Sequence, residues 1–333
     1  MKRRLPGIGV FGLALGVIGL MAATASGAGG PVTPSIHAAG VSTPDGRIRF
    51  IDRQEGRRTV VTRAKGGYPD GSASIPGRFK IPAVSFDGSA SGLSADGGTL
   101  VLRQARYPRR HTSFAIVDAQ ELRLRRVITL PGFFTFDAIS PDGSRLFFIE
   151  YPSPRNAIRY AVREYDVDAA RLLPNPIVDP SERGEQMRGN PITRAVSRDG
   201  RWAYTLYDGG GKSPFIHALD TVAGEAHCID DIDALARLSG RDLFNLHLTV
   251  SGGGGQLTIA DRDERPVALV DTRTFEATEP APQAPAAQGR PAGNDSGAPW
   301  SLIMPAAAVF LLAGTALTRI LRHRRDDLAA GGT

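Results

Sequence analysis

An acidic and a basic residue in matching positions are the strongest chemical signal in the sequence. Asp137 and Arg194 each lie three residues before the serine of a repeated turn motif, so they occupy equivalent sites in adjacent repeats. Partly buried opposite charges are normally paired. Two interpretations remain open. One is a structural ion pair between neighbouring sheets, and the other is a polar ligand site on a central axis, with Arg188, Asn190 and His247 near it.

Several segments imitate motifs of catalysis without completing them. Residues 209–213 (Gly-Gly-Gly-Lys-Ser) resemble a phosphate loop, but Leu206 stands where the motif needs its first glycine, so we interpret them as a hairpin loop. Residues 88–92 have alanine at the position of a hydrolase nucleophile. His217 and His247 lie in predicted strands, where packed histidines are commoner than metal ligands. We therefore expect no cofactor, no metal and no complete catalytic set.

Cys228 is the one cysteine of the chain, so an intrachain disulfide and a multi-cysteine zinc site are excluded. It follows His227 and precedes aspartates at positions 230, 231 and 233. This group is either half of a metal site or a buried cysteine beside a short helix over residues 232–238 that the aspartates cap. The second interpretation predicts that Cys228 reacts poorly with thiol reagents.

These residues must be positioned by a repeat that recurs about every 50 residues. Each unit has a strand, a Ser-x-Asp-Gly turn and another strand; the first turn, residues 42–46, is one residue longer, and the fifth unit is a degenerate version. The equivalent positions, spaced 51, 46, 57 and 54 residues apart, are Asp45, Asp96, Asp142, Asp199 and Gly253. Asp-Gly between β-rich runs favours a hairpin, because glycine accepts the positive φ of a tight turn. Aspartates that sit in separate turns are better explained as turn formers than as calcium ligands or catalytic acids.

A second element follows four of the hairpins: a short apolar strand that ends in aspartate, as in residues 114–118 and 267–271. A further strand often comes next, as in residues 126–130. Four strands in about 50 residues, repeated five times, predict an all-β fold, a β-propeller with five four-stranded blades over residues 36–278. The 39 glycines and 24 prolines suit such a turn-rich chain.

The Ser-Pro-Asp-Gly-x-x-Leu-x-Phe unit at residues 140–148 resembles the blade motif of TolB-like and YVTN-type bacterial β-propellers. The whole chain is also similar to actinobacterial propeller proteins with an export signal. The resemblance covers roughly residues 36–278. It implies the fold rather than an activity, because these propellers include binding scaffolds and a few enzymes.

The two ends have the composition of targeting segments. Residues 1–25 combine a basic start, an apolar stretch and an Ala-x-Ala site, which predicts a signal peptide. Residues 279–299 are rich in proline and alanine and predict a linker. Residues 300–318 are 19 residues without a charge, long enough for a transmembrane helix. The basic residues within 319–333 predict a short cytoplasmic tail.

The charge distribution bears on the partners and the location. Five of the six excess positive charges lie in the two terminal segments, so the pI near 9.7 does not indicate nucleic-acid binding. Lysine supplies only 4 of the 40 basic residues, which suggests a GC-rich bacterial genome. We therefore expect a single-pass protein of the bacterial plasma membrane, with its body outside the cytoplasm and its C-terminus inside.

Two classes of function remain after these observations. The first is a membrane-anchored binding or scaffold module whose partner is a protein or another cell-envelope ligand. The alternative is an extracytoplasmic enzyme, a hydrolase or lyase, with its site at the mouth of the propeller channel. A sensor is a third class, which the short tail disfavours. The long irregular stretch over residues 174–191 is a candidate functional loop.

Overall fold

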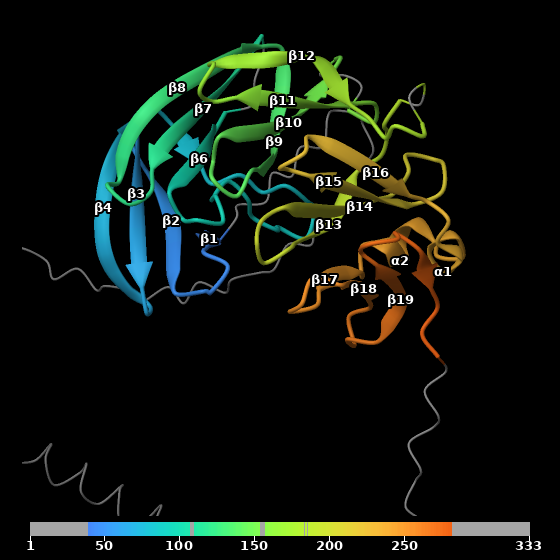
Figure 1. Cartoon of the computed structure of the whole chain (residues 1–333). Coiled ribbons are helices and arrows are strands. Elements are labelled where there is room, and N and C mark those ends of the chain that lie inside the picture. The colour runs from blue at the N-terminus through green and yellow to red at the C-terminus, as the bar shows by residue number, and fades with distance from the viewer. Residues whose placement is uncertain (1–38, 107–109, 154–156, 183, 185, 282–333) are drawn as a thin grey trace, which may run out of the picture. The chain divides into compact units, whose positions relative to one another are not determined.

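The computed structural model describes residues 39–281, except 107–109, 154–156, 183 and 185. All of them belong to the first of the two compact units into which the chain divides, Met1–Ala281. Their strands form five four-stranded antiparallel sheets arranged like propeller blades, and Figure 1 shows these sheets in chain order. The predicted signal peptide, the transmembrane helix, the tail and all but the first residues of the linker lie outside the described residues.

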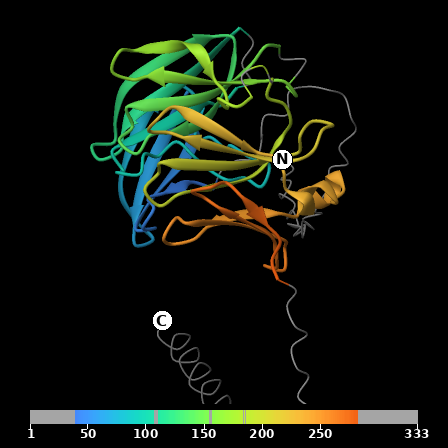
Figure 2. The same cartoon turned by 45° about the vertical axis from the view of Figure 1, so that its right-hand side comes forward.

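Each blade consists of four consecutive strands, and Figure 2 shows the same blades from a second direction. Blade 1 contains β1 (Val41–Ser42), β2 (Ile48–Glu55), β3 (Arg58–Lys65) and β4 (Tyr68–Pro76). Blade 2 contains β5 (Phe79–Lys80), β6 (Thr99–Gln104), β7 (His111–Asp118) and β8 (Arg123–Pro131). Blade 3 contains β9 (Phe133–Ile139), β10 (Arg145–Tyr151), β11 (Ala161–Asp166) and β12 (Arg171–Ile177). Blade 4 contains β13 (Pro191–Val196), β14 (Trp202–Tyr207), β15 (Phe215–Asp220) and β16 (Glu225–Ile229). Blade 5 contains β17 (His247–Val250), β18 (Gln256–Ala260), β19 (Pro266–Asp271) and β20 (Ala277–Thr278).

The Ser-x-Asp-Gly motif forms the turn between the first two strands of a blade. In blade 3 the Ser140 hydroxyl donates to Asp142 Oδ1 at 2.6 Å, and the Ser144 amide donates to the same oxygen at 3.0 Å. Gly143 completes the turn with a φ of +73°. In the fifth repeat Gly254 has the same φ, and its amide bonds the Ser251 carbonyl at 2.8 Å, so the turn forms without an aspartate.

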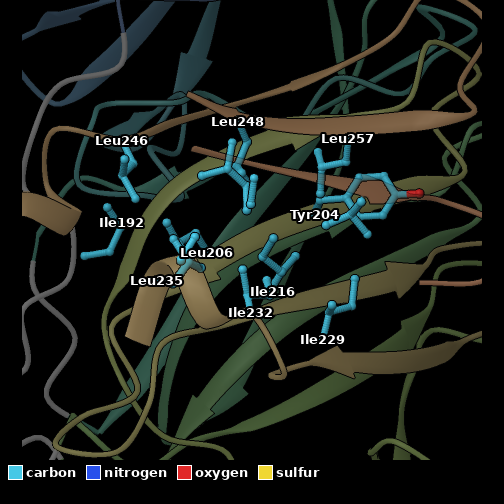
Figure 3. Close-up of a cluster of buried hydrophobic side chains, with 14 of the residues drawn as sticks. Ile192, Tyr204, Leu206, Ile216, Ile229, Ile232, Leu235, Leu246, Leu248 and Leu257 are labelled. Carbon is cyan, nitrogen blue, oxygen red and sulfur yellow. The ribbon is translucent and has the colours of Figure 1, made fainter. Parts of the chain in front are cut away.

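The core is divided among the contacts between successive blades. Four clusters of buried apolar side chains join blades 1 and 2, 2 and 3, 3 and 4, and 4 and 5. Among the described residues no such cluster joins blade 5 to blade 1. In the cluster of blades 4 and 5, Ile232 and Leu235 pack beside Leu206 and Ile216 (Figure 3).

Two four-residue helices precede blade 5, α1 (Asp233–Ala236) and α2 (Gly240–Leu243). The predicted helix over residues 232–238 is therefore shorter and is followed by a second one. The prediction that aspartates cap it is wrong, because the N-cap of α1 is Ile232 and makes no side-chain hydrogen bond. Neither helix is long enough to cross a membrane, and no other helix of residues 39–281 is either.

Blade 2 contains an irregular segment, residues 81–91, which we call the excursion. β5 pairs with the end of β6, and the chain returns to pair with the start of β6 only at the bridge of Leu93 to Leu100. Between these points, the Phe86 amide donates to the Pro191 carbonyl of blade 4 at 2.9 Å. The Phe86 ring also meets Phe244, with ring centroids 5.7 Å apart. The excursion therefore crosses from blade 2 to the non-adjacent blade 4.

Candidate functional site

The predicted contact between adjacent blades is present at Asp137 and Arg194. Asp137 lies in β9 and Arg194 in β13, and their side chains are 2% and 3% exposed. Arg194 Nη2 donates to Asp137 Oδ1, and Nη1 donates to the Asp137 carbonyl. Arg194 Nε donates to Thr205 Oγ1 at 2.9 Å. The pair is thus an ion pair in the interior, as the alignment of the repeats predicted.

A buried histidine shares the surroundings of this pair. His217 is 1% exposed in β15, and its burial lowers the pKa of the imidazole to about 4, although the Asp137 carboxylate opposes the shift. The ring is therefore neutral near pH 7. Its Nε2 and Asp137 Oδ2 are buried atoms without a hydrogen-bond partner among the described residues. The prediction of a packed strand histidine agrees with this burial.

Arg188 and Asn190 do not contact the ion pair but hold the loop at residues 208–213. Arg188 Nη2 donates to the Gly210 carbonyl at 2.9 Å. Asn190 donates from its amide to Asp208 Oδ1 at 2.7 Å and from Nδ2 to Asp208 Oδ2 at 2.8 Å. This loop joins β14 to β15, as predicted for a hairpin rather than a phosphate loop.

His247 is separated from the other predicted site residues. It is the first residue of β17 in blade 5, and its Nε2 lies 3.0 Å from Glu264 Oε2 within the same blade. Its side chain is 28% exposed, against 81% for Glu264. The structure therefore places the five predicted residues in three groups, and a ligand role for any of them stays a prediction.

A cavity of about 290 Å³ lies between loops of blades 3 and 4, and we call it the loop pocket. Its lining combines carboxylates, cations and apolar side chains: Val178, Asp179, Glu182, Gln186, Met187, Arg188, Gly209, Lys212, Ser213, Phe215, Cys228 and Asp230. One wall is part of the irregular stretch over residues 174–191, which the sequence indicated as a candidate loop. The facing wall is the hairpin loop at residues 208–213, which Arg188 holds. The sequence indicated each part but not that they share one cavity.

Asp179 links the irregular stretch to β16, which also lines the loop pocket. Its Oδ2 accepts the Cys228 amide at 2.8 Å, and its Oδ1 accepts the Ser181 amide at 2.8 Å. Burial alone would raise the pKa of Asp179, but these hydrogen bonds outweigh it, so that the pKa is lowered. His227 Nδ1 lies 3.9 Å from the same carboxylate. Asp179 is therefore a fixed negative charge in the pocket wall.

The prediction that Cys228 is buried is wrong, because it is partly exposed and lines the loop pocket. Its partial burial raises the pKa of the thiol above the usual value, and the carboxylates of Glu182 and Asp179 raise it further. The thiol is thus protonated at neutral pH. Within residues 39–281 as described, no three His, Cys, Asp or Glu side chains are grouped to hold a metal ion.

A second cavity of about 460 Å³ lies at the end of the blades that carries the Ser-x-Asp-Gly turns, and we call it the channel mouth. All five blades contribute to it, including Ser42, Leu93, Ile139, Arg198 and Gly252. Arg198 is the one charged residue of its lining. The other lining side chains are small, apolar or hydroxyl-bearing, so this site has no acid–base pair.

Comparisons with known proteins place the chain beside other propellers. No protein-family model matches the sequence, and no curated protein matches it either. The similar solved structures include a putative TolB of Agrobacterium tumefaciens, 16% identical over 74% of this chain and 81% of that chain, with a TM-score of 0.40. They also include a hydrazine synthase of Kuenenia stuttgartiensis, 17% identical over 76% and 80%, with a TM-score of 0.41. A protein of unknown function from Desulfotomaculum acetoxidans is 13% identical over 73% and 68%, with a TM-score of 0.46. TolB proteins are thus among the similar structures, as the blade motif predicted, and at these identities the likeness concerns the fold alone.

Proposed function

We propose that the chain is a binding module whose ligand site is the loop pocket. The observation that carries the proposal is a cavity of about 290 Å³ built by two loops that side chains hold in place. Small-molecule sites are typically preformed, mostly apolar clefts with a few placed polar groups. Here Val178, Met187 and Phe215 supply apolar surface beside the charged groups.

The charges in the wall indicate the chemistry of the ligand. Asp179 is held as an anion, Arg188 is a cation on the same stretch of chain, and Lys212 is a cation on the facing hairpin loop. A small polar compound with both a basic and an acidic group would find a counter-charge for each. The thiol of Cys228 is protonated, so it contributes to the surface of the pocket rather than a nucleophile.

We propose further that the module stands outside the plasma membrane of a bacterium, with the segment 300–318 as its anchor. The support is the sequence: a basic and apolar start with an Ala-x-Ala site, a proline-rich segment and a second uncharged segment followed by arginines. A partner of the module would then be a protein or a cell-envelope component. The enzymatic alternative at the channel mouth gains no support, because Arg198 is the one ionisable group of that lining.

The ligand site is tested through Cys228, because it is the one thiol of the chain. The rate at which a small thiol reagent labels the full-length protein is measured with and without fractions of a cell-envelope extract. A fraction that contains the ligand should slow labelling. Lys212→Ala in the pocket wall should remove that protection, whereas Arg198→Ala at the channel mouth should keep it. Equal behaviour of the two variants, or no protection by any fraction, would refute the proposed site.

The membrane topology is tested separately by adding protease to intact cells. The proposal predicts that the body is removed and that a small fragment stays in the membrane. Full protection of the body until the cells are lysed would place it in the cytoplasm and refute this part of the proposal without affecting the loop pocket.

A further inference from the structure

Three arginines surround a hollow between blades 1 and 2, and we call it the arginine hollow. It measures about 760 Å³ and is lined by Gly56, Arg57, Gly77, Arg78, Phe79, Gln104, Arg106 and Ser113. Arg57 lies in the turn between β2 and β3, Arg78 between β4 and β5, and Arg106 beyond the end of β6. Three separate connections of the chain therefore bring one cation each to the same concavity.

Hydrogen bonds to their backbone carbonyls fix the main chain of these arginines. The Gly77 amide donates to the Arg57 carbonyl at 3.1 Å, and the Ala105 amide donates to the Arg78 carbonyl at 2.8 Å. Gln104 Nε2 donates to the Arg106 carbonyl at 3.2 Å. The main chain at each site is thus anchored, while the side chain is left to solvent.

Gly77 has a specific role in the shape of the hollow. Its φ is +100°, and a Cβ at this position would lie 3.3 Å from Cδ2 of the Phe79 ring, with another ring carbon nearer still. Glycine therefore lets the chain turn closely over Phe79, which is 6% exposed and forms an apolar floor. Arg78 follows Gly77 directly, lines the hollow and is exposed.

The three guanidinium groups have no counter-charge. Each of the residues is exposed, and among the described residues none of their side chains forms an ion pair or a hydrogen bond. The lining of the hollow includes no acidic residue. Elsewhere in the protein arginines are commonly paired, as Arg163 is with Glu150 in blade 3. Like charges held together without neutralisation attract an anion.

We propose that the arginine hollow binds the phosphate groups of a multivalent anionic ligand. Guanidinium groups present two parallel N–H donors that match phosphate oxygens, and they stay charged at all physiological pH values. Three of them around one concavity suit a ligand with more than one phosphate group or a surface of phosphate headgroups. This site is independent of the loop pocket, which lies between blades 3 and 4.

The test measures binding of inorganic tripolyphosphate to the full-length protein by calorimetry. The variant in which Arg57, Arg78 and Arg106 are all glutamine should bind at least about tenfold more weakly. A control variant removes the same charge from three other exposed arginines without side-chain partners, namely Arg171, Arg198 and Arg262. The control should bind within about twofold of the wild type if attraction to net charge alone is minor.

A second arm distinguishes the sources of the phosphate groups. Flotation with phosphatidylglycerol vesicles and with phosphatidylcholine vesicles shows whether the hollow takes anionic lipid headgroups as well as a soluble phosphate compound. Selective loss of either kind of binding in the hollow variant supports the site. Equal losses in the two triple variants, or no binding of tripolyphosphate and anionic vesicles by the wild type, would overturn it. If the triple variant unfolds, the three single substitutions are compared instead, and each should weaken binding by about threefold.

Discussion

Replacing Arg194 by alanine should destabilise the protein severely, because it leaves a charged carboxylate without its partner in the interior. The two side chains are 3% and 2% exposed, so solvent cannot replace the lost contact. The guanidinium also donates to Thr205 and to the Asp137 carbonyl, and Asp137 Oδ2 has no hydrogen-bond partner among the described residues. Breaking a buried ion pair from one side costs about 3–5 kcal/mol. We expect a loss of that size in the free energy of unfolding.

The double variant gives the sharper measurement. Asp137→Ala should cost a similar amount, since it strands the guanidinium. Removing both partners leaves no unpaired charge, so the double variant should lose less than the sum of the two single losses, by about 2 kcal/mol or more. The structural cause of that difference is the shared contact between β9 and β13.

The assay is urea denaturation of the full-length protein, followed by circular dichroism and by tryptophan fluorescence, to which Trp202 in β14 contributes. Arg123→Ala serves as the control, because Arg123 pairs with Glu121 at 3.1 Å and the two side chains are 67% and 62% exposed. Such a solvent-exposed pair should contribute about 1 kcal/mol or less. Additive losses in the Asp137 and Arg194 variants would refute the reasoning, as would a loss at Arg194 no larger than the control.

Three further outcomes are expected. The free energy of unfolding should fall as the pH is lowered from 6.5 towards 4. In the unfolded chain His217 takes up a proton at its ordinary pKa, whereas in the folded protein its pKa is about 4. At pH 5 this difference in proton uptake should lower the free energy of unfolding by about 2 kcal/mol. His217→Leu should remove this pH dependence, as measured by urea titrations at several pH values. Cys228 should react slowly with thiol reagents at pH 7 in the native protein and rapidly in urea, since its pKa is raised; equal rates would contradict the raised pKa. Asp142→Ala should lower the free energy of unfolding by about 1–2 kcal/mol, because the turn loses the hydrogen bonds of the carboxylate. The circular dichroism spectrum should stay unchanged, because the fifth repeat forms the same turn with Gly253 in the place of the aspartate. A changed spectrum would show that the aspartate is required for the fold.

The blade architecture could be predicted because the turn motif is a local signal. Its requirements are a glycine with positive φ and a return hydrogen bond, which Gly143 and Gly254 both satisfy. The first repeat is one residue longer, and the structure shows that Thr43 rather than Ser42 takes the place of the serine, with its hydroxyl 2.6 Å from Asp45 Oδ1. The Asp-Gly pair thus sets the register of each of the first four repeats, and the preceding hydroxyl can come from threonine instead of serine.

The ion pair could be predicted for the same reason, but the rest of the site could not. Alignment on the turn gives the depth of Asp137 and Arg194 in their blades, and both face the boundary of blades 3 and 4. It also gives the depth of His247, but not the direction of its side chain, which meets Glu264 instead. Aligning the repeats therefore gives the position of a residue along its blade, but not the side chain that it contacts.

The loop pocket and the excursion depend on contacts without any periodic pattern. Asp179 bonds the amide of Cys228, which lies 49 residues away in a different blade. Phe86 bonds Pro191 across more than a hundred residues, and the segment around it contains no strand pattern that would mark its path. Irregular segments meet through backbone hydrogen bonds, which any residue type can make, so composition does not reveal them.

The four apolar clusters have a consequence for how the molecule opens. An apolar cluster joins each blade to the next, and the described residues show no such cluster between blade 5 and blade 1. We therefore expect the blades to unfold like a linear array of repeats with two ends. Terminal members of such an array have one stabilising neighbour each and fray first. The excursion adds a contact between blade 2 and blade 4. We therefore expect amide hydrogen exchange to be fastest in the β17–β20 and β1–β4 sheets and slowest in the β9–β12 sheet, and uniform protection would indicate that the ends are joined.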